Sequence, residues 1–368
     1  MEKKYKLTEE TIKVNGSILH RIEALKDFAN IKKGDKGGFV EKEENLSQSG
    51  DCWVYHNAEV YDNAEVYDDA KVSEDARIYG KARVYGNALV CGNASIYGDA
   101  RVFDNAKVFG NAEVYGDAKV FDNAEVYGNA KVYGNALIYG RAIIYDNAKV
   151  YDEADVCEDA KVFEDAEVFG NAYVFGNAEI YGDAKVYENA EAYDDAMVYD
   201  NAKVYGNAKV YGYATVYGDA VVCDNAKVFG NAEVYGDAKV FDNAEVYGNA
   251  KVFENAEVSF YTKVYDNAKV YGYAEVQGNA KVYGNAEVRT DACIYGDAVI
   301  DSIGDYIVFK NFWSSGRSFT WTRSNDMWKV GCFYGTGEEL IEKAYKDSEI
   351  SGREYERIVK YVETIKGE

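Results

Sequence analysis

The sequence predicts an all-β solenoid, in which short strands and tight corners wind into stacked coils. From Val54 to Ile300 an aliphatic residue recurs every six positions, with only the smaller Ala192 as an exception, and this makes 42 hexads without an insertion. Alanine lies two positions before each of these residues, except at Cys52 and Thr262. Proline, which would interrupt a backbone ladder, is absent from all 368 residues.

Each hexad follows the consensus A-[KE]-V-[YF]-[GD]-[ND], which predicts a short strand followed by a corner. Successive side chains of a strand point to opposite faces, so alanine and valine point inward while the lysine or glutamate between them points outward. The last two positions favour a turn, because glycine, asparagine and aspartate adopt positive φ angles most easily. Each coil is therefore expected to bury its alanines and valines against the next coil.

These hexads resemble the hexapeptide-repeat family, whose motif is an aliphatic residue with a small residue two positions before it. The resemblance covers about two-thirds of the chain. It implies a single-stranded left-handed parallel β-helix of about 14 triangular coils, with three hexads in each coil. The chain departs from the family at the position after the aliphatic residue, which is Tyr or Phe almost throughout, and the glycine falls one place later.

The outward charges support three hexads per coil independently of this resemblance. In the segment 104–132 the outward positions are Lys107, Glu113, Lys119, Glu125 and Lys131. Three hexads per coil place Lys107 beside Glu125, whereas two or four would place like charges side by side and destabilise the strand pair. The segment recurs letter for letter at 224–252. This offset is not a whole number of coils, so the two copies fall on different sides of the triangle, which argues against one privileged catalytic face.

The two ends of the chain lack the hexad and are predicted to cap the coils. This gives an N-terminal cap (residues 1–51), a hexapeptide-repeat β-solenoid (52–300) and a C-terminal cap (301–368). The stretch from Gly34 to Val54 resembles the entry segment of uncharacterised hexapeptide-repeat proteins of bacteria and phages. No biochemical role is established for those proteins, so the resemblance implies relatives and no mechanism.

The C-terminal cap is predicted to be a small α+β domain of the order βββαα. Its strands are YIVFKNFW, SFTWTR and MWKVGCFY, separated by the turn sequences SSGR and SND. Two capping boxes, Thr336 with Glu339 and Ser351 with Glu354, predict the starts of two helices. One face of the second helix is apolar and consists of Tyr355, Ile358, Val359 and Val362.

The sequence predicts no catalytic residue, cofactor or metal site. Acyltransferases of the hexapeptide-repeat family rely on a histidine and on loops that protrude from the coils, but the solenoid has only His56 and no inserted loop. The related zinc-dependent carbonic anhydrases need three histidine ligands, and the chain contains only His20 and His56. The six cysteines show neither the spacing of a zinc site nor that of a disulfide framework.

The aromatic column after the aliphatic position is the most prominent surface feature of the predicted coils. Tyr115, Tyr133 and Tyr151 follow one another on one side, one ring per coil. One interpretation is that the rings form a tyrosine ladder that shields the backbone. The other is that they bind sugar rings or a protein, because apolar surfaces of this extent usually contact a ligand.

The C-terminal cap holds the non-repetitive residues that are best suited to recognise a partner. These are Trp313, Arg317, Trp321, Arg323 and Trp328. Tryptophan and arginine are enriched among the residues that dominate binding energy in protein interfaces. The alternative is that the three tryptophans form the core of this small domain.

Negative charge is concentrated in the solenoid. Residues 1–51 hold 10 basic and 10 acidic side chains and residues 301–368 hold 10 and 12, so 52–300 carry −21 of the net charge of −23. Many of these acids are corner aspartates, which can serve turns and solubility alone. They could also imitate a nucleic-acid backbone and occupy a DNA-binding protein, whereas direct nucleic-acid binding by so acidic a surface is disfavoured.

The sequence therefore favours a non-enzymatic β-solenoid scaffold or protein-interaction rod. The alternative is an acidic protein of a phage or bacterium that sequesters a host nucleic-acid-binding or defence protein, and an acyltransferase-like enzyme ranks third. A protein partner is expected but not identified, and homo-oligomers remain open. The sequence has neither an apolar signal nor an apolar run of membrane-spanning length, so a cytoplasmic protein without membrane contact is expected.

Overall fold

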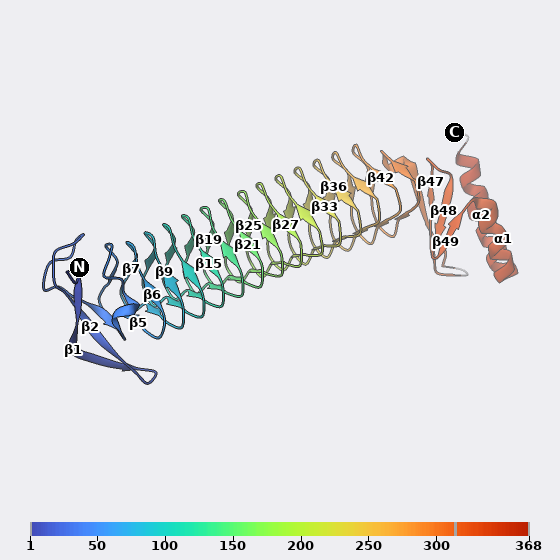
Figure 1. Cartoon of the computed structure of the whole chain (residues 1–368). Coiled ribbons are helices and arrows are strands. Elements are labelled where there is room, and N and C mark those ends of the chain that lie inside the picture. Colours follow the sequence, from blue (N-terminus) through green and yellow to red (C-terminus); the bar gives the residue numbers. More distant parts are fainter. Residues whose placement is uncertain (1, 313–314, 367–368) are drawn as a thin grey trace. The chain divides into compact units, whose positions relative to one another are not determined.

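Two-residue strands that recur every six residues form most of the structure, a computed structural model that describes residues 2–312 and 315–366. The chain consists of two compact units, unit 1 (Met1–Asp200) and unit 2 (Asn201–Glu368). The short strands run from β4 (Trp53–Val54) to β28 (Met197–Val198) in unit 1 and from β29 (Lys203–Val204) to β45 (Val299–Ile300) in unit 2. They wind into about 15 turns, which confirms a parallel β-solenoid (Figure 1).

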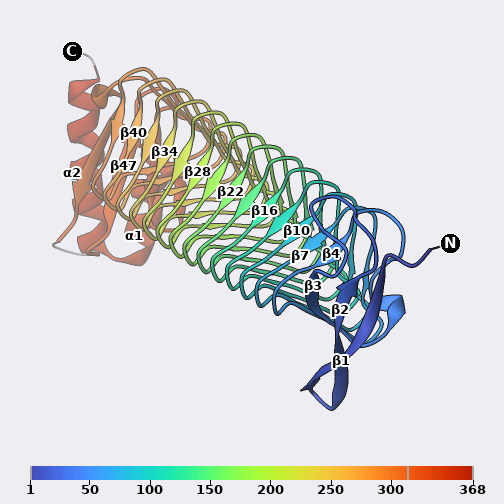
Figure 2. The same ribbon diagram turned by 90° about the vertical axis from the view of Figure 1, so that its left-hand side faces the viewer.

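Three strands make one coil, because each strand pairs in parallel with the strand three places further along within its unit. In unit 1, β13 (Lys107–Val108) pairs with β16 (Glu125–Val126). In unit 2, β33 (Lys227–Val228) pairs with β36 (Glu245–Val246). Figure 2 shows one column of unit 1 as a row from β4 through β10 (Leu89–Val90) and β16 to β28. The predicted three hexads per coil are confirmed.

Backbone hydrogen bonds hold neighbouring coils together, and many of them run from an N–H group to a carbonyl of the following coil. The N–H of Lys107 donates to the carbonyl of Ala124 (2.9 Å) and that of Phe109 to the carbonyl of Val126 (3.0 Å), each in the following coil. Ala124 and Val126 are fully buried, like the other inward residues of the hexads. Thr262 replaces one inward alanine, and its buried hydroxyl donates to a backbone carbonyl (3.3 Å). The predicted inward positions therefore form the apolar core of each unit.

The corners adopt the left-handed conformation that the sequence predicts. The φ angle is +57° at Asp104 and +70° at Gly110. An acid at this position often accepts a hydrogen bond from the N–H at the same corner one coil later, as Asp122 does from Gly140 (3.1 Å). These carboxylates therefore stabilise the corners, in addition to the charge that they add to the surface of the coils.

The outward charges pair as predicted. Lys107 Nζ lies 2.8 Å from Glu125 Oε1, and Lys131 Nζ lies 3.1 Å from Glu113 Oε1. In the second copy of the segment, the equivalent pairs are Lys227–Glu245 (3.6 Å) and Lys251–Glu233 (2.8 Å). These exposed pairs contribute modestly to stability, but they confirm the register that the charge pattern predicts.

The N-terminal cap is a hairpin joined to the first coils. Strand β1 (Tyr5–Val14) pairs antiparallel with β2 (Ser17–Ala24), which pairs antiparallel with β3 (Lys36–Val40). Strand β3 then pairs in parallel with β5 (Glu59–Val60), and the short 3-10 helix η1 (Glu43–Asn45) follows.

Parallel stacking thus begins before the first hexad. Val40 lies opposite Val60, and Leu46 forms a parallel bridge with Val66. Leu46 and Val54 are eight positions apart instead of six, so the six-residue period does not reveal this additional turn.

The direction of the ladder leaves carbonyl groups exposed on the first coils, and the N-terminal cap covers them with donors. Lys4 is buried, with 1% of its surface exposed. Its ammonium donates to three backbone carbonyls at 2.9–3.4 Å, those of Ser49, Gly50 and Cys52. The hydroxyl of Tyr5 donates to the carbonyl of Leu46 (2.7 Å). These bonds explain the buried lysine, because a buried ammonium needs acceptors to offset its lost hydration.

The last coil of unit 2 has the opposite requirement, because its N–H groups lack a following coil. The N–H of Cys293 donates to Thr320 Oγ1 (2.8 Å), and the N–H of Val299 donates to Ser324 Oγ (2.7 Å). The carboxylate of Asp305 accepts from two further N–H groups at 2.9 Å. The C-terminal cap therefore supplies acceptor oxygens to these N–H groups. It also supplies one donor, because the Tyr306 hydroxyl donates to the carbonyl of Glu287 (2.9 Å).

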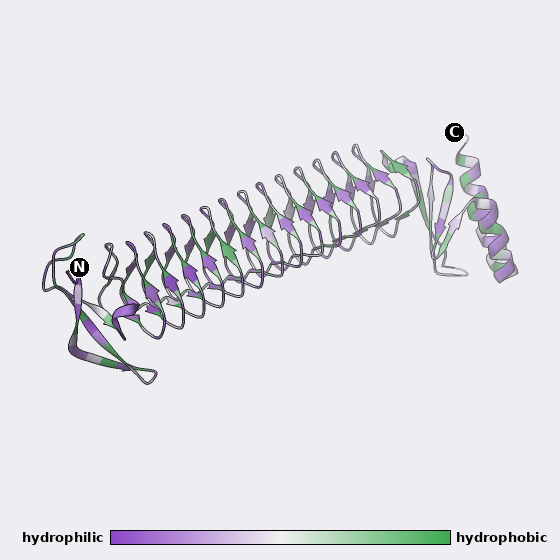
Figure 3. Cartoon of the chain, viewed as in Figure 1, coloured by the Kyte–Doolittle hydropathy of each residue, from purple (hydrophilic) through white to green (hydrophobic). Residues whose placement is uncertain are grey.

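The C-terminal cap is a four-stranded antiparallel sheet followed by two amphipathic helices (Figure 3). After the 3-10 helix η2 (Ile303–Asp305), its elements are β46 (Tyr306–Lys310), β47 (Ser318–Thr322), β48 (Met327–Val330), β49 (Phe333–Gly335), α1 (Gly337–Asp347) and α2 (Glu349–Ile365). The stretch MWKVGCFY, predicted as one strand, forms both β48 and β49, because Gly331 adopts a φ of +56° and turns the chain between them.

The first predicted capping box is confirmed, and the second is wrong. Thr336 Oγ1 accepts from the N–H of Glu339 (3.3 Å), and the Glu339 carboxylate accepts from the N–H of Thr336 (2.9 Å). Helix α2 begins earlier than predicted, because Ser348 provides its N-cap and accepts from the N–H of Ser351 (3.0 Å). Ser351 therefore lies within the first turn of α2.

Replacing Glu125 by Lys is expected to lower the free energy of unfolding by about 0.2–1 kcal/mol, because Lys107 then faces a like charge. The outer neighbours of this pair in the same column are Leu89 and Ile143, which carry no charge. The second change Lys107→Glu should therefore restore the loss. Urea unfolding of the two single variants and the double variant measures it, and a double variant no more stable than the Glu125→Lys variant would contradict the pairing.

Replacing Lys4 by Met should loosen the first coils, because three carbonyls lose their buried donor while the volume is kept. Amide hydrogen exchange of residues 53–72 should accelerate about 5- to 150-fold. Lys3→Met is the matched control, since Lys3 is exposed and makes only a surface ion pair with Glu43. Equal exchange in the two variants would show that Lys4 has no capping role.

Candidate functional site

The residues predicted to bind a partner in the C-terminal cap fall into two groups. Trp321 and Trp328 are buried, at 2% and 0% exposure, in a core completed by residues of both helices. Their indoles offer no surface to a partner. Arg317 and Arg323 are exposed. Trp313 lies outside the described residues.

The predicted tyrosine ladder is present in the coils. The rings of Tyr115 and Tyr133 are 4.8 Å apart and 3° from parallel, and those of Tyr133 and Tyr151 are 4.8 Å apart and parallel. Both faces of the Tyr133 ring are thus covered by its neighbours. A sugar ring stacks on an aromatic face, so this geometry favours the shielding interpretation over sugar binding.

His56 occupies a corner of the first coil and replaces the usual glycine or acid there. It is exposed, with a φ of +51°. Its Nδ1 accepts a hydrogen bond from the N–H of Glu74 one coil later (3.3 Å). This is the same bond that the corner carboxylates make, so His56 has a structural role that needs no proton transfer.

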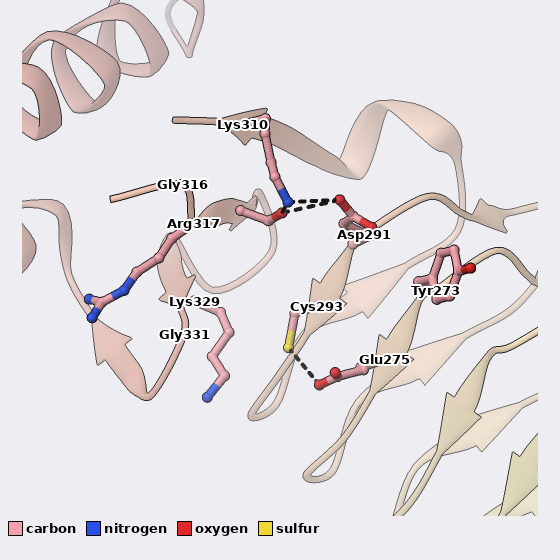
Figure 4. Close-up of a pocket in the computed structure, with 11 residues that line it drawn as sticks. Tyr273, Glu275, Asp291, Cys293, Lys310, Gly316, Arg317, Lys329 and Gly331 are labelled. Atoms are coloured by element: carbon pink, nitrogen blue, oxygen red, sulfur yellow. Dashed lines mark hydrogen bonds and ion pairs between the residues drawn. The ribbon is translucent and has the colours of Figure 1, made fainter. Parts of the chain in front are cut away.

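A polar cavity of about 510 Å³ lies where the last coils of unit 2 meet the C-terminal cap (Figure 4). The coils contribute one wall, with side chains next to β41 (Glu275–Val276) and β44 (Cys293–Ile294). The cap contributes the other wall, from the end of β46, the start of β47 and strand β48. The charged residues that line the cavity are Glu275, Asp291, Lys310, Arg317 and Lys329.

One cation of this cavity is neutralised within the site. Lys310 Nζ lies 3.2 Å from Asp291 Oδ2 and 3.1 Å from Ser318 Oγ, and the Ser318 hydroxyl donates to Asp291 (3.4 Å). This network joins the coil to the cap, and it leaves Asp291 bonded to two donors.

Cys293 and Glu275 form a second pair. The thiol donates to Glu275 Oε2 (3.6 Å). Burial, together with the charge of Glu275, raises the pKa of Cys293 to about 12. Cys293 is therefore a neutral thiol at physiological pH, which is poorly suited to act as a nucleophile.

The two remaining cations lie on the cap wall. Lys329 Nζ is 4.5 Å from the centre of the Tyr295 ring, a cation–π contact between β48 and the last coil. Arg317 is exposed beside the turn at Gly331. At the mouth of the cavity, Tyr273 occupies a corner position that is usually Asn or Asp and is 67% exposed.

Among the residues that line this cavity, only Arg317 is predicted from the sequence to bind a partner. The other charged residues come from segments far apart in the chain, and no period relates the cap to the coils. Tyr273 breaks the Asn or Asp pattern of the corners, but Tyr213 and Tyr261 break it as well, so this pattern does not single out the cavity.

The described residues contain no group of three or more His, Cys, Asp or Glu side chains suited to hold a metal ion. All six cysteines, each within the described ranges, are free thiols. Among the described residues, no helix has both the length and the apolar character needed to span a membrane.

The chain is similar to one known family of repeats. The family described as the YdcK beta solenoid repeat matches residues 76–92 and 82–98. The two matches are offset by one hexad and lie within the coils of unit 1. No curated protein matches the chain.

Cys293 is expected to resist alkylation, because a pKa of about 12 leaves only about one thiol in 10⁴ ionised at pH 8. The exposed Cys332 should react with iodoacetamide first, as followed by peptide mass spectrometry. Glu275→Gln should accelerate the alkylation of Cys293, because it removes the charge that disfavours the thiolate. The alkylation rate of Cys332 should stay unchanged. Equal rates at the two cysteines of the unsubstituted protein would contradict this assignment.

Proposed function

We propose that this protein is a non-enzymatic β-solenoid scaffold that attaches a partner protein at its C-terminal cap. The observation that carries the proposal is the contrast between uniform coils and a polar cavity where the coils end. Residues 54–300, all of which the structure describes, follow the hexad without an insertion that could enclose a substrate. The coils therefore suit a scaffold, and the cap supplies the irregular surface that a specific contact needs.

The chemistry of the candidate residues also supports a non-enzymatic role. His56 is engaged at a corner by a backbone N–H, and Cys293 is held as a neutral thiol. Acyl transfer needs a positioned base and a pocket for donor and acceptor. Neither histidine lines the cavity beside the cap. An acyltransferase is therefore the least favoured reading.

The acidic coils favour a second candidate, a protein that sequesters a nucleic-acid-binding or defence protein. The net charge of −21 in residues 52–300 is the observation behind it. Such a partner would bind along the coils and would dissociate at high salt, because many exposed charges contribute. A partner of the cap would instead depend on a few defined residues.

A deletion in the coils and a substitution in the cap separate these proposals. Removing residues 106–123 takes out 18 residues, one coil, and keeps the hexad in phase. The deletion should leave partner capture intact, whereas changing both Arg317 and Arg323 to Glu should abolish it. Co-purification of the partner with the full chain and with each variant measures both effects. Capture that is lost with the coil and kept in the arginine variant would overturn attachment at the cap.

A further inference from the structure

Two cations of the cavity beside the cap, Arg317 and Lys329, make no ion pair with any other described residue. Figure 4 shows Lys310 joined to Asp291 and Cys293 joined to Glu275, while the side chains of Arg317 and Lys329 point away from Asp291 and have no bonded carboxylate. The acids of the cavity are thus already bonded, and the positive charge on the cap wall is available to a ligand.

The surroundings of the two cations differ. The ammonium of Lys329 rests 4.5 Å from the centre of the Tyr295 ring. A Cβ at Gly331 would lie 3.6 Å from Cδ and 3.7 Å from Nε of Arg317, so the stem of this arginine runs beside the turn. The ring contact restricts Lys329, which therefore loses less conformational entropy when it binds a ligand, whereas Arg317 is exposed.

The chemistry of the cavity favours a carboxylate over a phosphate. Guanidinium groups bind either oxyanion with two parallel hydrogen bonds. Asp291 and Glu275 remain negative nearby, and they repel a phosphate dianion more strongly than a single carboxylate. The exposed ring of Tyr273 adds an apolar edge for the chain that presents the carboxylate.

We propose that this cavity binds a carboxylate from an acidic segment of the partner protein, with Arg317 as the main ligand and Lys329 as the second. The inference rests on the proposed function, in which the cap attaches a partner, and it names the chemistry of that contact. The negative coils repel an acidic segment elsewhere on the protein, so the cavity provides the local attraction.

Calorimetric titration of the full chain with a hexaglutamate peptide tests the proposal. Arg317→Gln should weaken peptide binding by about tenfold or more, because it removes charge-assisted hydrogen bonds. The Arg317→Lys variant should bind the peptide with an affinity between those of the unsubstituted chain and Arg317→Gln, since lysine keeps the charge and lacks the planar guanidinium. Arg323→Gln is the matched control, an exposed arginine of the same cap that does not line the cavity.

Binding that weakens in Arg317→Gln and stays unchanged in Arg323→Gln would support the site. No binding by the unsubstituted chain, or equal weakening in both variants, would overturn it. Tighter binding of inorganic phosphate than of the peptide would overturn the choice of carboxylate. The two proposals can fail separately. If the partner no longer co-purifies with the variant in which Arg317 and Arg323 are changed to Glu, but the peptide does not bind the unsubstituted chain, then the partner attaches at the cap and the carboxylate site is wrong.

Discussion

The stacking of the coils leaves different backbone groups unsatisfied at its two ends, and the caps depend on this difference. Many backbone N–H groups, such as those of Lys107, Phe109 and Asn111, donate to carbonyls of the following coil. A first coil therefore has carbonyls that lack these donors, and a last coil has N–H groups that lack these acceptors. In the N-terminal cap, Lys4 is therefore buried among backbone carbonyls, to which its ammonium donates. In the C-terminal cap, the hydroxyls of Thr320 and Ser324 accept from N–H groups of the last coil. Each cap also makes a bond of the opposite sense, because Glu41 accepts from the N–H of Asp62 and the Tyr306 hydroxyl donates to the carbonyl of Glu287.

The same ladder fixes the spacing of every side-chain column. Coils about 4.8 Å apart bring rings to stacking distance, place Lys107 over Glu125, and let Asn93 donate to Asn111 (3.0 Å) at the corner. Many side chains thus find a partner in the equivalent residue of a neighbouring coil. A surface that satisfies itself in this way leaves few groups for a ligand. In the proposed function, recognition takes place where the repeat ends and side chains have no equivalent neighbour, such as Arg317 beside β47.

This dependence on the repeat also explains what the sequence could predict. The inward residues, the corners and the pairing of Lys107 with Glu125 follow from a period that no insertion disturbs. The additional turn through Leu46 was not predicted, because eight residues separate it from Val54. In the cap no period exists, so a single turn at Gly331 divided a predicted strand, and Ser348 displaced a predicted N-cap. The cavity combines residues from the coils, β46 and β48, and only tertiary contacts bring Lys329 near Arg317.

Charge gives the cap its contrast with the coils. The exposed Lys and Glu columns nearly neutralise one another, and the corner acids leave residues 52–300 with a net charge of −21. At physiological ionic strength such charges act over about 8 Å, so a ligand responds to the coil surface nearest to it. An acidic segment is repelled by the net charge of the coils, and in the proposed site it meets Arg317 and Lys329 on the cap wall of the cavity. Attachment at one defined place therefore requires no pocket along the coils, and the uniformity of the repeat becomes compatible with a specific contact.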